Sequence, residues 1–266
     1  MSVKRLFENT YCLTDKGPAG SVRAFLLIGE ERALLIDTGY GATDFPTVIK
    51  EITKKPVTVA LTHGHLDHAG GAFLFDDVYM HTSDKAVFEK HTGKVFLADS
   101  YKGRHDLRGK YAVPLERIIN SEKRMPKPLE EIETFDLGGR VITWINISGH
   151  TPGCCTFLDE KNGVAFTGDM LSPCIWLQLP ESRSLDEYKA SILKLKSRLQ
   201  SAGIRYIYPA HYHKWNAEKS IDAFCRLVEA VKSGKARKRK YNNSMEGGAL
   251  SGTLYGKGFV WLVIKD

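Results

Sequence analysis

The segment His63-Gly64-His65-Leu66-Asp67-His68 places three imidazoles and one carboxylate within six residues. It directly follows Val57–Leu61, a short run of almost continuous apolar and partly β-branched residues that predicts a buried strand. Imidazole nitrogen and carboxylate oxygen are both ligands that borderline-soft metal ions such as zinc accept. This density of ligand groups predicts a metal site at the end of a strand.

The spacing within the segment predicts how its ligands are shared. Residues two apart in an extended chain point to the same side, so we expect His63 and His65 to bind one ion together. We expect Gly64 to keep the space between the two imidazoles clear. Asp67 and His68 follow a further bend, and we expect them to face a second ion close to the first.

Four ligand groups cannot complete two ions, so further ligands are expected at the ends of other strands. A lone histidine or aspartate in a loop is usually a solvated or capping residue, but an incomplete metal site reverses that expectation. Each candidate follows a β-prone run and lies among small or turn-forming residues. The candidates are His150 after Ser148-Gly149, Asp169 after Thr167-Gly168, and His211 after Pro209-Ala210.

Length and composition indicate a globular protein. The chain has 266 residues, of which 42% are hydrophobic and 26% charged, a balance too apolar for a disordered protein. No apolar run approaches the roughly 18 residues needed to span a bilayer, and the N-terminus has no hydrophobic signal segment. We therefore expect no membrane association, and five irregularly spaced cysteines without a C-x-x-C pair favour a reduced, cytoplasmic protein.

Hydrophobic periodicity predicts strands followed by a helix, twice over. Two sheets packed together and covered by helices on the outside would bury these faces within a single domain spanning 1–266. Ser184 and Glu187 form a capping box at the start of the longest predicted helix. The predicted elements are strands at Val22–Ile28, Arg32–Asp37, Val57–Leu61, Arg140–Ile147, Gly153–Leu158, Val164–Thr167, Arg205–Tyr208 and Phe259–Ile264, and helices at Thr43–Ile52, Leu185–Ala202 and Ala217–Ser233.

Two basic stretches lie outside this pattern. Residues 92–128 show no sustained period and are expected to form an insertion or lid. Residues 232–266 form a basic C-terminal segment, and we expect its charged run to be a solvated helix end, with anion or nucleic-acid binding as the alternative. That run consists of Lys235, Arg237, Lys238, Arg239 and Lys240. The net charge of +7 favours an anionic substrate or loose association with nucleic acid.

Taken together, the motifs resemble those of the metallo-β-lactamase superfamily. Leu34–Gly39 is similar to its first motif, His63–His68 to its second and Gly149–Gly153 to its third. Thr167–Asp169 and Pro209–His211 are similar to the fourth and fifth. The resemblance implies an α/β fold, a four-layer αββα sandwich, with the site along one edge of the two sheets.

The resemblance also implies how the ligands are divided. It assigns His63, His65 and His150 to one ion. It assigns Asp67, His68 and His211 to the other, with Asp169 as the bridge between the two ions.

Departures from particular members narrow the resemblance. Flavodiiron-type relatives have an acidic residue where this chain has His65, and class B β-lactamases commonly have a cysteine near the place of Asp169. The RNA-processing members carry a large second domain for which this chain has no room. The remaining group resembles hydroxyacylglutathione hydrolases and N-acyl homoserine lactonases.

These features predict a metal-dependent hydrolase that uses a hydroxide activated by a binuclear metal centre to cleave an ester, thioester or lactone. Asp67 is expected to orient the nucleophile and to pass a proton to the leaving group. The expected cofactors are two divalent ions, zinc first, with iron or manganese as alternatives. The substrate is expected to be a small molecule, and the basic charge favours an anionic one. Oligomeric state is left open.

Two rival interpretations use the same residues. One is a phosphodiesterase or nucleic-acid-processing hydrolase on the same metal site, aided by the basic segments. The other treats the metals as structural, although a closed structural zinc usually has four protein ligands. Tyr212, His213 and Trp215 are expected to contact substrate or to pack.

Overall fold

The computed structural model describes residues 1–103, 109–245 and 248–265, and within these ranges the chain forms two compact units. The first unit comprises Met1–Val141 and the second begins at Ile142. Each unit contains β-sheet and helices, so the predicted α/β class is confirmed. The prediction of a single domain stays a prediction.

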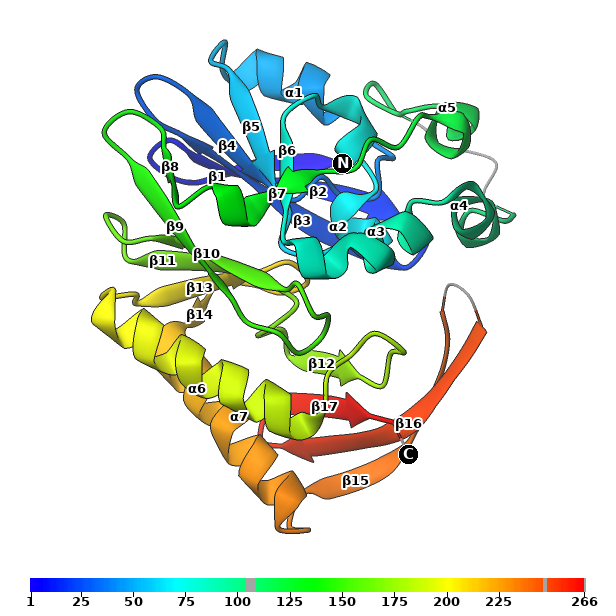
Figure 1. The fold of residues 1–266 in the computed structure, drawn as a ribbon, viewed down its shortest axis with the longest axis vertical. Helices are drawn as coiled ribbons and strands as arrows, with labels where there is room; N and C mark the ends of the chain where they lie inside the picture. The colour runs from blue at the N-terminus through cyan, green and yellow to red at the C-terminus, as the bar shows by residue number, and fades with distance from the viewer. Residues whose placement is uncertain (104–108, 246–247, 266) are drawn as a thin grey trace. The chain divides into compact units, whose positions relative to one another are not determined.

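The first unit is built on a seven-stranded mixed sheet, whose strands lie side by side in chain order (Figure 1). Its first four strands are antiparallel and the rest run parallel. The strands predicted at Val22–Ile28 and Arg32–Asp37 are present as the antiparallel pair β3 and β4, and the predicted strand before His63 is present as β5. The strands are β1 (Ser2–Phe7), β2 (Thr10–Gly17), β3 (Gly20–Ile28), β4 (Ala33–Ile36), β5 (Val57–Ala60), β6 (Val78–Met80) and β7 (Lys127–Pro128), and the short β8 (Thr134–Asp136) follows.

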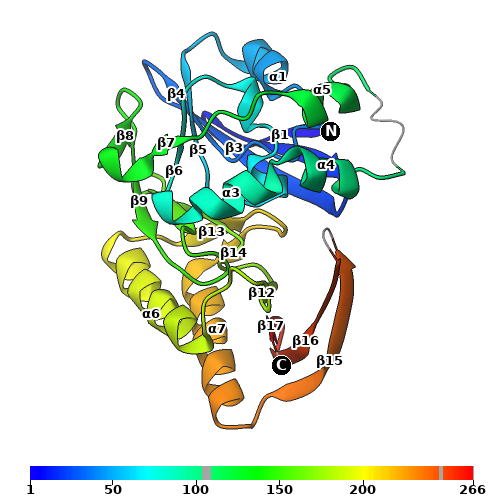
Figure 2. The ribbon, with the colours of Figure 1, turned by 45° about the vertical axis from the view of Figure 1, so that its right-hand side comes forward.

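Helices of the first unit cover one face of this sheet. Phe45, Val48 and Ile49 of α1 pack with Phe88 of α3 against apolar side chains of the strands. Asp44 caps α1 by accepting a hydrogen bond from the Thr47 N–H, and Pro46 is tolerated in the first turn, where its missing N–H needs no partner. The helices are α1 (Phe45–Ile52), α2 (Leu66–Ala69), α3 (Lys85–His91), α4 (Lys94–Ser100) and α5 (Leu115–Asn120), with three short 3₁₀ turns (Figure 2).

The stretch 92–128 contains more regular structure than its sequence indicates. It forms α4 and α5, which bury Leu97 and Ile118, and the Tyr101 hydroxyl donates a 3.0 Å hydrogen bond to the Tyr40 carbonyl. Helices of seven and six residues are too short to show a helical period in sequence, which is why the sequence indicates no regular structure here. The insertion or lid stays a prediction. Arg104 and Arg108 of this stretch lie outside the described residues.

The second unit has two sheets. In one, the strands of this unit run in the order β14-β13-β11-β10-β9, with β11 and β13 parallel. In the other, the order is β12-β17-β16-β15. The strands are β9 (Val141–Asn146), β10 (Cys155–Asp159), β11 (Val164–Gly168), β12 (Cys174–Leu177), β13 (Tyr206–Pro209), β14 (Trp215–Asn216), β15 (Arg237–Met245), β16 (Gly248–Lys257) and β17 (Val260–Ile264).

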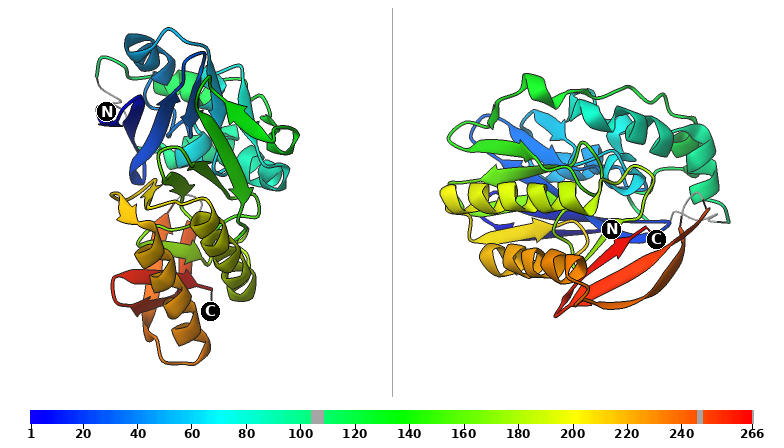
Figure 3. Two further views of the ribbon diagram at one scale, coloured as in Figure 1. Left: turned by 90° about the vertical axis from the view of Figure 1, so that its left-hand side faces the viewer. Right: turned by 60° about the horizontal axis from the view of Figure 1, so that its bottom comes forward.

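Two long helices, α6 (Leu185–Ser201) and α7 (Ala217–Lys232), lie side by side in the second unit (Figure 3). The predicted capping box is present: the Ser184 hydroxyl accepts from the Glu187 N–H, and the Glu187 carboxylate accepts from the Ser184 N–H. The apolar stripe of α6 is buried against α7 and the sheets. Its fully buried members are Tyr188, Ile192, Leu195 and Leu199.

The basic run near the C-terminus is a strand, so the prediction of a solvated helix end was wrong. Helix α7 ends at Lys232, and Gly234 adopts a φ of 70°. The Gly234 N–H donates to the Val231 carbonyl and the Lys235 N–H to the Ala230 carbonyl, which satisfies two of the last helical carbonyls. The chain then turns into β15, so Arg237–Lys240 pair with β16.

All five cysteines are free thiols, and Cys154 and Cys155 are buried. Among the helices of the described residues, none combines the length and the apolar character that crossing a bilayer requires.

A buried carboxylate holds the loop that follows β4. Asp15 is 1% exposed and accepts hydrogen bonds from the Tyr40 N–H at 3.0 Å and the Thr43 hydroxyl at 2.7 Å. Burial raises the pKa of Asp15, although these hydrogen bonds act in the opposite direction. This carboxylate therefore ties β2 to the loop that carries the first motif.

We expect Asp15→Ala to lower the free energy of unfolding by about 2–4 kcal/mol, because it leaves buried donors without an acceptor. Asp44→Ala is the control, since it removes a helix cap in the same unit and should cost only about 1 kcal/mol. Urea unfolding followed by circular dichroism measures both. Equal costs for the two variants would contradict this role of Asp15.

Candidate metal centre

The first cluster of ligand residues is organised by Asp37, which directly follows β4. Its carboxylate accepts from the Thr62 N–H at 2.7 Å and from the Thr62 hydroxyl at 2.8 Å. His68 Nδ1 lies 2.8 Å from Asp37 Oδ2. A hydrogen bond at Nδ1 holds the proton there and leaves Nε2 as the metal-binding nitrogen. Asp37 therefore ties the loop after β4 to the loop that carries the ligands.

Thr38 adds two hydrogen bonds between the loop after β4 and His68. The Thr38 N–H and hydroxyl both donate to the His68 carbonyl, at 2.7 and 2.8 Å. Asp37 itself has a φ of 64°, in the left-handed region that costs a non-glycine residue roughly 1–2 kcal/mol. Its charge-assisted hydrogen bonds, each contributing about 1.5–3 kcal/mol, offset that strain. The orientation of His68 is therefore set before any ion binds.

His63 and His65 converge as the spacing predicts. His63 Nε2 lies 3.1 Å from His65 Nδ1, and the ring centroids are 4.7 Å apart in an edge-to-face arrangement. Both side chains are buried. Two imidazole nitrogens at this separation can share one ion.

The expected role of Gly64 was wrong. A Cβ atom at this position would lie 2.7 Å from the Phe88 nitrogen and 3.1 Å from the Asp84 carbonyl oxygen. The glycine is therefore required by the close approach of α3, and not by the space between the imidazoles. The buried Asp84 carboxylate also accepts from the Gly64 N–H at 2.9 Å, which fixes the backbone between the two histidines.

Asp67 and His68 lie on the short helix α2 and complete this cluster. Asp67 Oδ2 is 3.4 Å from His68 Nε2, and the His63 and His68 ring centroids are 4.0 Å apart. Asp67 is the most exposed of the group, with 21% of its side chain accessible. It is thus the group best placed to meet a water molecule or a substrate.

Sequence reasoning missed two residues around this cluster, Asp84 and His91. The His91 ring lies 4.5 Å from the ring of His65 and 4.3 Å from that of Phe96. His91 ends α3 and Asp84 precedes it, and neither belongs to a dense ligand motif. Only the packing of α3 against Gly64 brings them here.

The second cluster lies in the second unit and is centred on Asp169. Asp169 Oδ2 is 3.6 Å from His150 Nε2, whereas Oδ1 is 3.4 Å from His211 Nε2. Asp169 directly follows β11 and His211 closely follows β13. Because these strands are parallel neighbours, their carboxyl ends meet at one sheet edge. The two oxygens of one carboxylate therefore face two different imidazoles.

His150 is oriented by backbone contacts. Its Nδ1 lies 2.8 Å from the carbonyl oxygen of Trp176, which places the proton at Nδ1 and leaves Nε2 toward Asp169. The Ser182 hydroxyl donates to the His150 carbonyl at 2.9 Å. The Tyr188 hydroxyl donates to the Met170 carbonyl, and burial raises the pKa of Tyr188 so that this donor stays protonated.

The sequence profile of the metallo-β-lactamase superfamily matches residues 17–211, which include all five motifs and both clusters. The chain belongs to the metallo-β-lactamase superfamily. The protein is accordingly a hydrolase of this superfamily, as its motifs predict.

Curated relatives in the superfamily include two thioesterases. The acyl-coenzyme A thioesterase MBLAC2 of Gallus gallus is 23% identical over 207 residues, covering 73% of this chain and 74% of the relative. The Homo sapiens protein of the same name is 25% identical over 214 residues, with the same coverage. The hydroxyacylglutathione hydrolase GloC of Haemophilus influenzae is 30% identical over 148 residues, covering 53% of this chain and 62% of the relative.

Solved structures confirm the metallo-β-lactamase fold. A metallo-β-lactamase from Pontibacter korlensis aligns with a TM-score of 0.58 and 18% identity, over 86% of this chain and 98% of that protein. The protein TTHA1623, crystallised in a di-iron-bound form, aligns with a TM-score of 0.57 and 26% identity, over 77% and 93%.

The seven predicted ligands thus lie in two clusters, each within one unit. His63, His65, Asp67 and His68 are together in the first, and His150, Asp169 and His211 in the second. Their division between two ions stays a prediction. Trp215 packs its ring edge-to-face with Tyr212 at 5.1 Å and with Phe259 at 5.3 Å, which shows a packing role.

We expect Asp37→Asn to weaken metal retention about 10- to 100-fold, because the amide no longer holds the Nδ1 proton of His68. Asp44→Asn is the matched control, since Asp44 only caps α1. Metal content measured after dialysis against graded concentrations of chelator compares the variants. Unchanged retention in a folded Asp37→Asn protein would show that this carboxylate does not tune the ligand.

Proposed function

We propose that the two clusters together hold two divalent metal ions and that the enzyme hydrolyses acyl thioesters. The observation that carries the proposal is the Asp169 carboxylate, whose two oxygens face different histidines. A carboxylate with this arrangement suits a bridge between two cations. His63, His65 and His150 would hold one ion, and Asp67, His68 and His211 the other.

The donor atoms fit a divalent ion of borderline softness. Five imidazoles and two carboxylates without a thiolate favour zinc, iron or manganese over softer metals. The di-iron form of a structural relative supports iron beside zinc. Two such ions, when bound, supply a nucleophilic water at neutral pH and polarise a carbonyl oxygen.

The chain's own residues would position and move protons. Asp67 is partly exposed beside His68, so its carboxylate can orient a water molecule and later pass a proton to the leaving group. Asp37 and the Trp176 carbonyl hold His68 and His150 in one tautomer each. Because these contacts fix the two imidazoles in advance, the rings need not reorient during the reaction.

A thioester is favoured over other acyl bonds because of the relatives. Two of them are named acyl-coenzyme A thioesterases and a third a hydroxyacylglutathione hydrolase. A thiolate leaving group needs less protonation than an alkoxide, so the single carboxylate of Asp67 suffices as a proton donor.

A panel of substrates on metal-quantified protein tests the bond type. We expect hydrolysis of acyl thioesters with a kcat/KM at least about 100-fold above that for a matched ester, a lactone and a phosphodiester. Preference for the phosphodiester would overturn the proposal and favour a phosphoester-cleaving enzyme.

A second test concerns Asp169. We expect about two ions per chain in the parent protein, and Asp169→Asn to lose one ion and at least about 100-fold in turnover. Glu160→Gln, which changes an exposed carboxylate in the same unit, is the control. Elemental analysis and steady-state kinetics measure both effects. Two retained ions with normal turnover would show that Asp169 is not the bridge.

A further inference from the structure

The basic run of the C-terminal segment is divided between two faces of a sheet. Strand β15 is the edge of the sheet β12-β17-β16-β15, and side chains alternate along it. Arg237 and Arg239 share one face, and Lys238 and Lys240 the other. All four side chains are exposed.

The two arginines of β15 lie beside the indole ring of Trp261. The Arg239 guanidinium lies 5.7 Å from the centroid of the Trp261 ring on β17. Between them, a Cβ atom at Gly256 would lie 2.2 Å from the Trp261 ring, so the indole rests against the backbone of β16. Arg237 pairs with Gly256 in the register, which places both arginines beside the indole.

The same face carries two further aromatic rings. Trp176 of β12 and Tyr241 of β15 approach with ring centroids 6.5 Å apart, across the buried side chains of Leu254 and Val263. We call this surface the arginine–aromatic face, defined as Arg237, Arg239, Tyr241, Trp261 and Trp176. Its three aromatic side chains are only partly buried.

The opposite face of the sheet packs against the apolar core of the unit. Ile175, Leu262 and Tyr255 point from it into the apolar core formed with α7. Lys238 and Lys240 lie on this same side of the sheet, but their side chains are exposed at its edge.

The four strands contribute only positive charge to the arginine–aromatic face. No aspartate or glutamate occurs in residues 174–177, 237–245, 248–257 or 260–264, which form the four strands. Guanidinium groups bind phosphates with paired donors, and aromatic rings stack on bases. The face therefore complements a ligand that combines phosphates with a planar heterocycle.

This face begins at the metal ligand His150. The Trp176 carbonyl holds His150 Nδ1, while the Trp176 side chain joins the face. Three strand spacings of about 4.8 Å separate β12 from β15, so the arginines stand roughly 14 Å away across the sheet. A ligand reaching both needs a long arm between its acyl group and its phosphates.

We propose that the arginine–aromatic face binds the nucleotide end of coenzyme A in an acyl-coenzyme A substrate. Arg237 and Arg239 bind the phosphates, and Trp261 and Tyr241 offer stacking surfaces for the adenine. The inference rests on the proposed thioesterase function and names the carrier of the acyl group.

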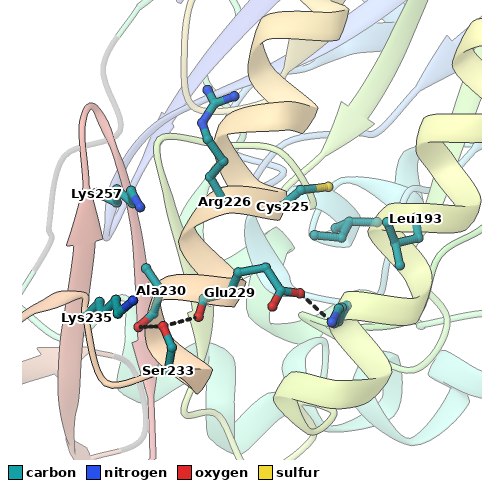
Figure 4. A pocket seen from close by; sticks show the side chains of 10 residues that line it. Leu193, Cys225, Arg226, Glu229, Ala230, Ser233, Lys235 and Lys257 are labelled. Carbon is teal, nitrogen blue, oxygen red and sulfur yellow. Dashed lines mark hydrogen bonds and ion pairs between the residues drawn. The ribbon is translucent and has the colours of Figure 1, made fainter.

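A second basic hollow in the same unit fits this role less well. It has a volume of about 480 Å³ and lies along α6 and α7, with Arg226, Lys235 and Lys257 in its lining (Figure 4). Its Lys189 is already paired with Glu229. The residues described around it include no aromatic side chain, so it offers no stacking surface.

The test compares two double variants of one strand. Arg237→Gln with Arg239→Gln removes two charges from the arginine–aromatic face, and Lys238→Gln with Lys240→Gln removes two from the opposite face. Calorimetric titration with coenzyme A at fixed ionic strength should give at least about 10-fold weaker binding for the arginine variant. The lysine variant should change binding less than about 2-fold.

Kinetics separate the carrier from the chemistry. For acyl-coenzyme A, the arginine variant should raise KM at least about 10-fold with little change in kcat. For the same acyl group on N-acetylcysteamine, which lacks the nucleotide, both constants should stay unchanged. Trp261→Leu should weaken coenzyme A binding without changing N-acetylcysteamine thioester hydrolysis.

The outcomes distinguish the two proposals. Equal loss of coenzyme A binding in the arginine and lysine variants would overturn the inference, since it shows attraction by net charge alone. Tighter binding of a single-stranded oligonucleotide than of coenzyme A would also overturn it, in favour of nucleic acid. Absence of thioester hydrolysis would refute the proposed function, while the titrations still decide whether this face binds coenzyme A.

Discussion

The hydrogen bond between Asp37 and His68 is the constraint on which the first cluster depends. One carboxylate, held in a strained left-handed conformation, connects the end of β4 to the loop after β5 through Thr62 and His68. Thr38 closes the same connection through the His68 carbonyl. Parallel pairing of β4 and β5 brings the two loops to one sheet edge, and the Asp37 contacts convert that proximity into a fixed imidazole orientation.

The second cluster achieves a similar result by different means. His150 is held by a backbone carbonyl of β12, and Asp169 and His211 meet because β11 and β13 are parallel neighbours. Carboxylate and carbonyl acceptors both keep the Nδ1 proton in place, so both clusters present Nε2 of the oriented histidine. Each cluster is thus ordered by its own unit's sheet.

Ligand residues could be predicted from sequence because their chemistry is concentrated in short motifs at strand ends. His63, His65 and His68 carry that signal by themselves, whereas Asp169 is a candidate only because their cluster lacks ligands. Asp84 and His91 could not be predicted, because only the close packing of α3 on Gly64 relates them to the site. Strands with clear hydrophobic runs, such as Val57–Ala60 and Val164–Gly168, were predicted within a residue or two.

The strand at Thr10–Gly17 was not predicted, because its buried positions do not follow from its own sequence pattern. Thr10–Gly17 contains Asp15 and Lys16, and its pattern does not alternate cleanly, although hydrogen bonds to Asp15 make the carboxylate part of the interior. The short helices at 94–100 and 115–120 were missed for a similar reason. Each buries only one side chain, Leu97 or Ile118, and one buried residue gives no helical period in the sequence.

The run at Arg237–Lys240 shows why charge in sequence is ambiguous about function. On a helix end, four consecutive cations would point around the axis into water and would act only through their summed field. Paired with β16, the same residues alternate, so two guanidinium groups join Trp261 and two ammonium groups leave by the other face. The glycine at 234 makes this difference, because its left-handed conformation ends α7 and permits the turn into β15. A backbone conformation at one residue thus determines whether the basic segment is a diffuse charge or a surface with a defined chemical complement.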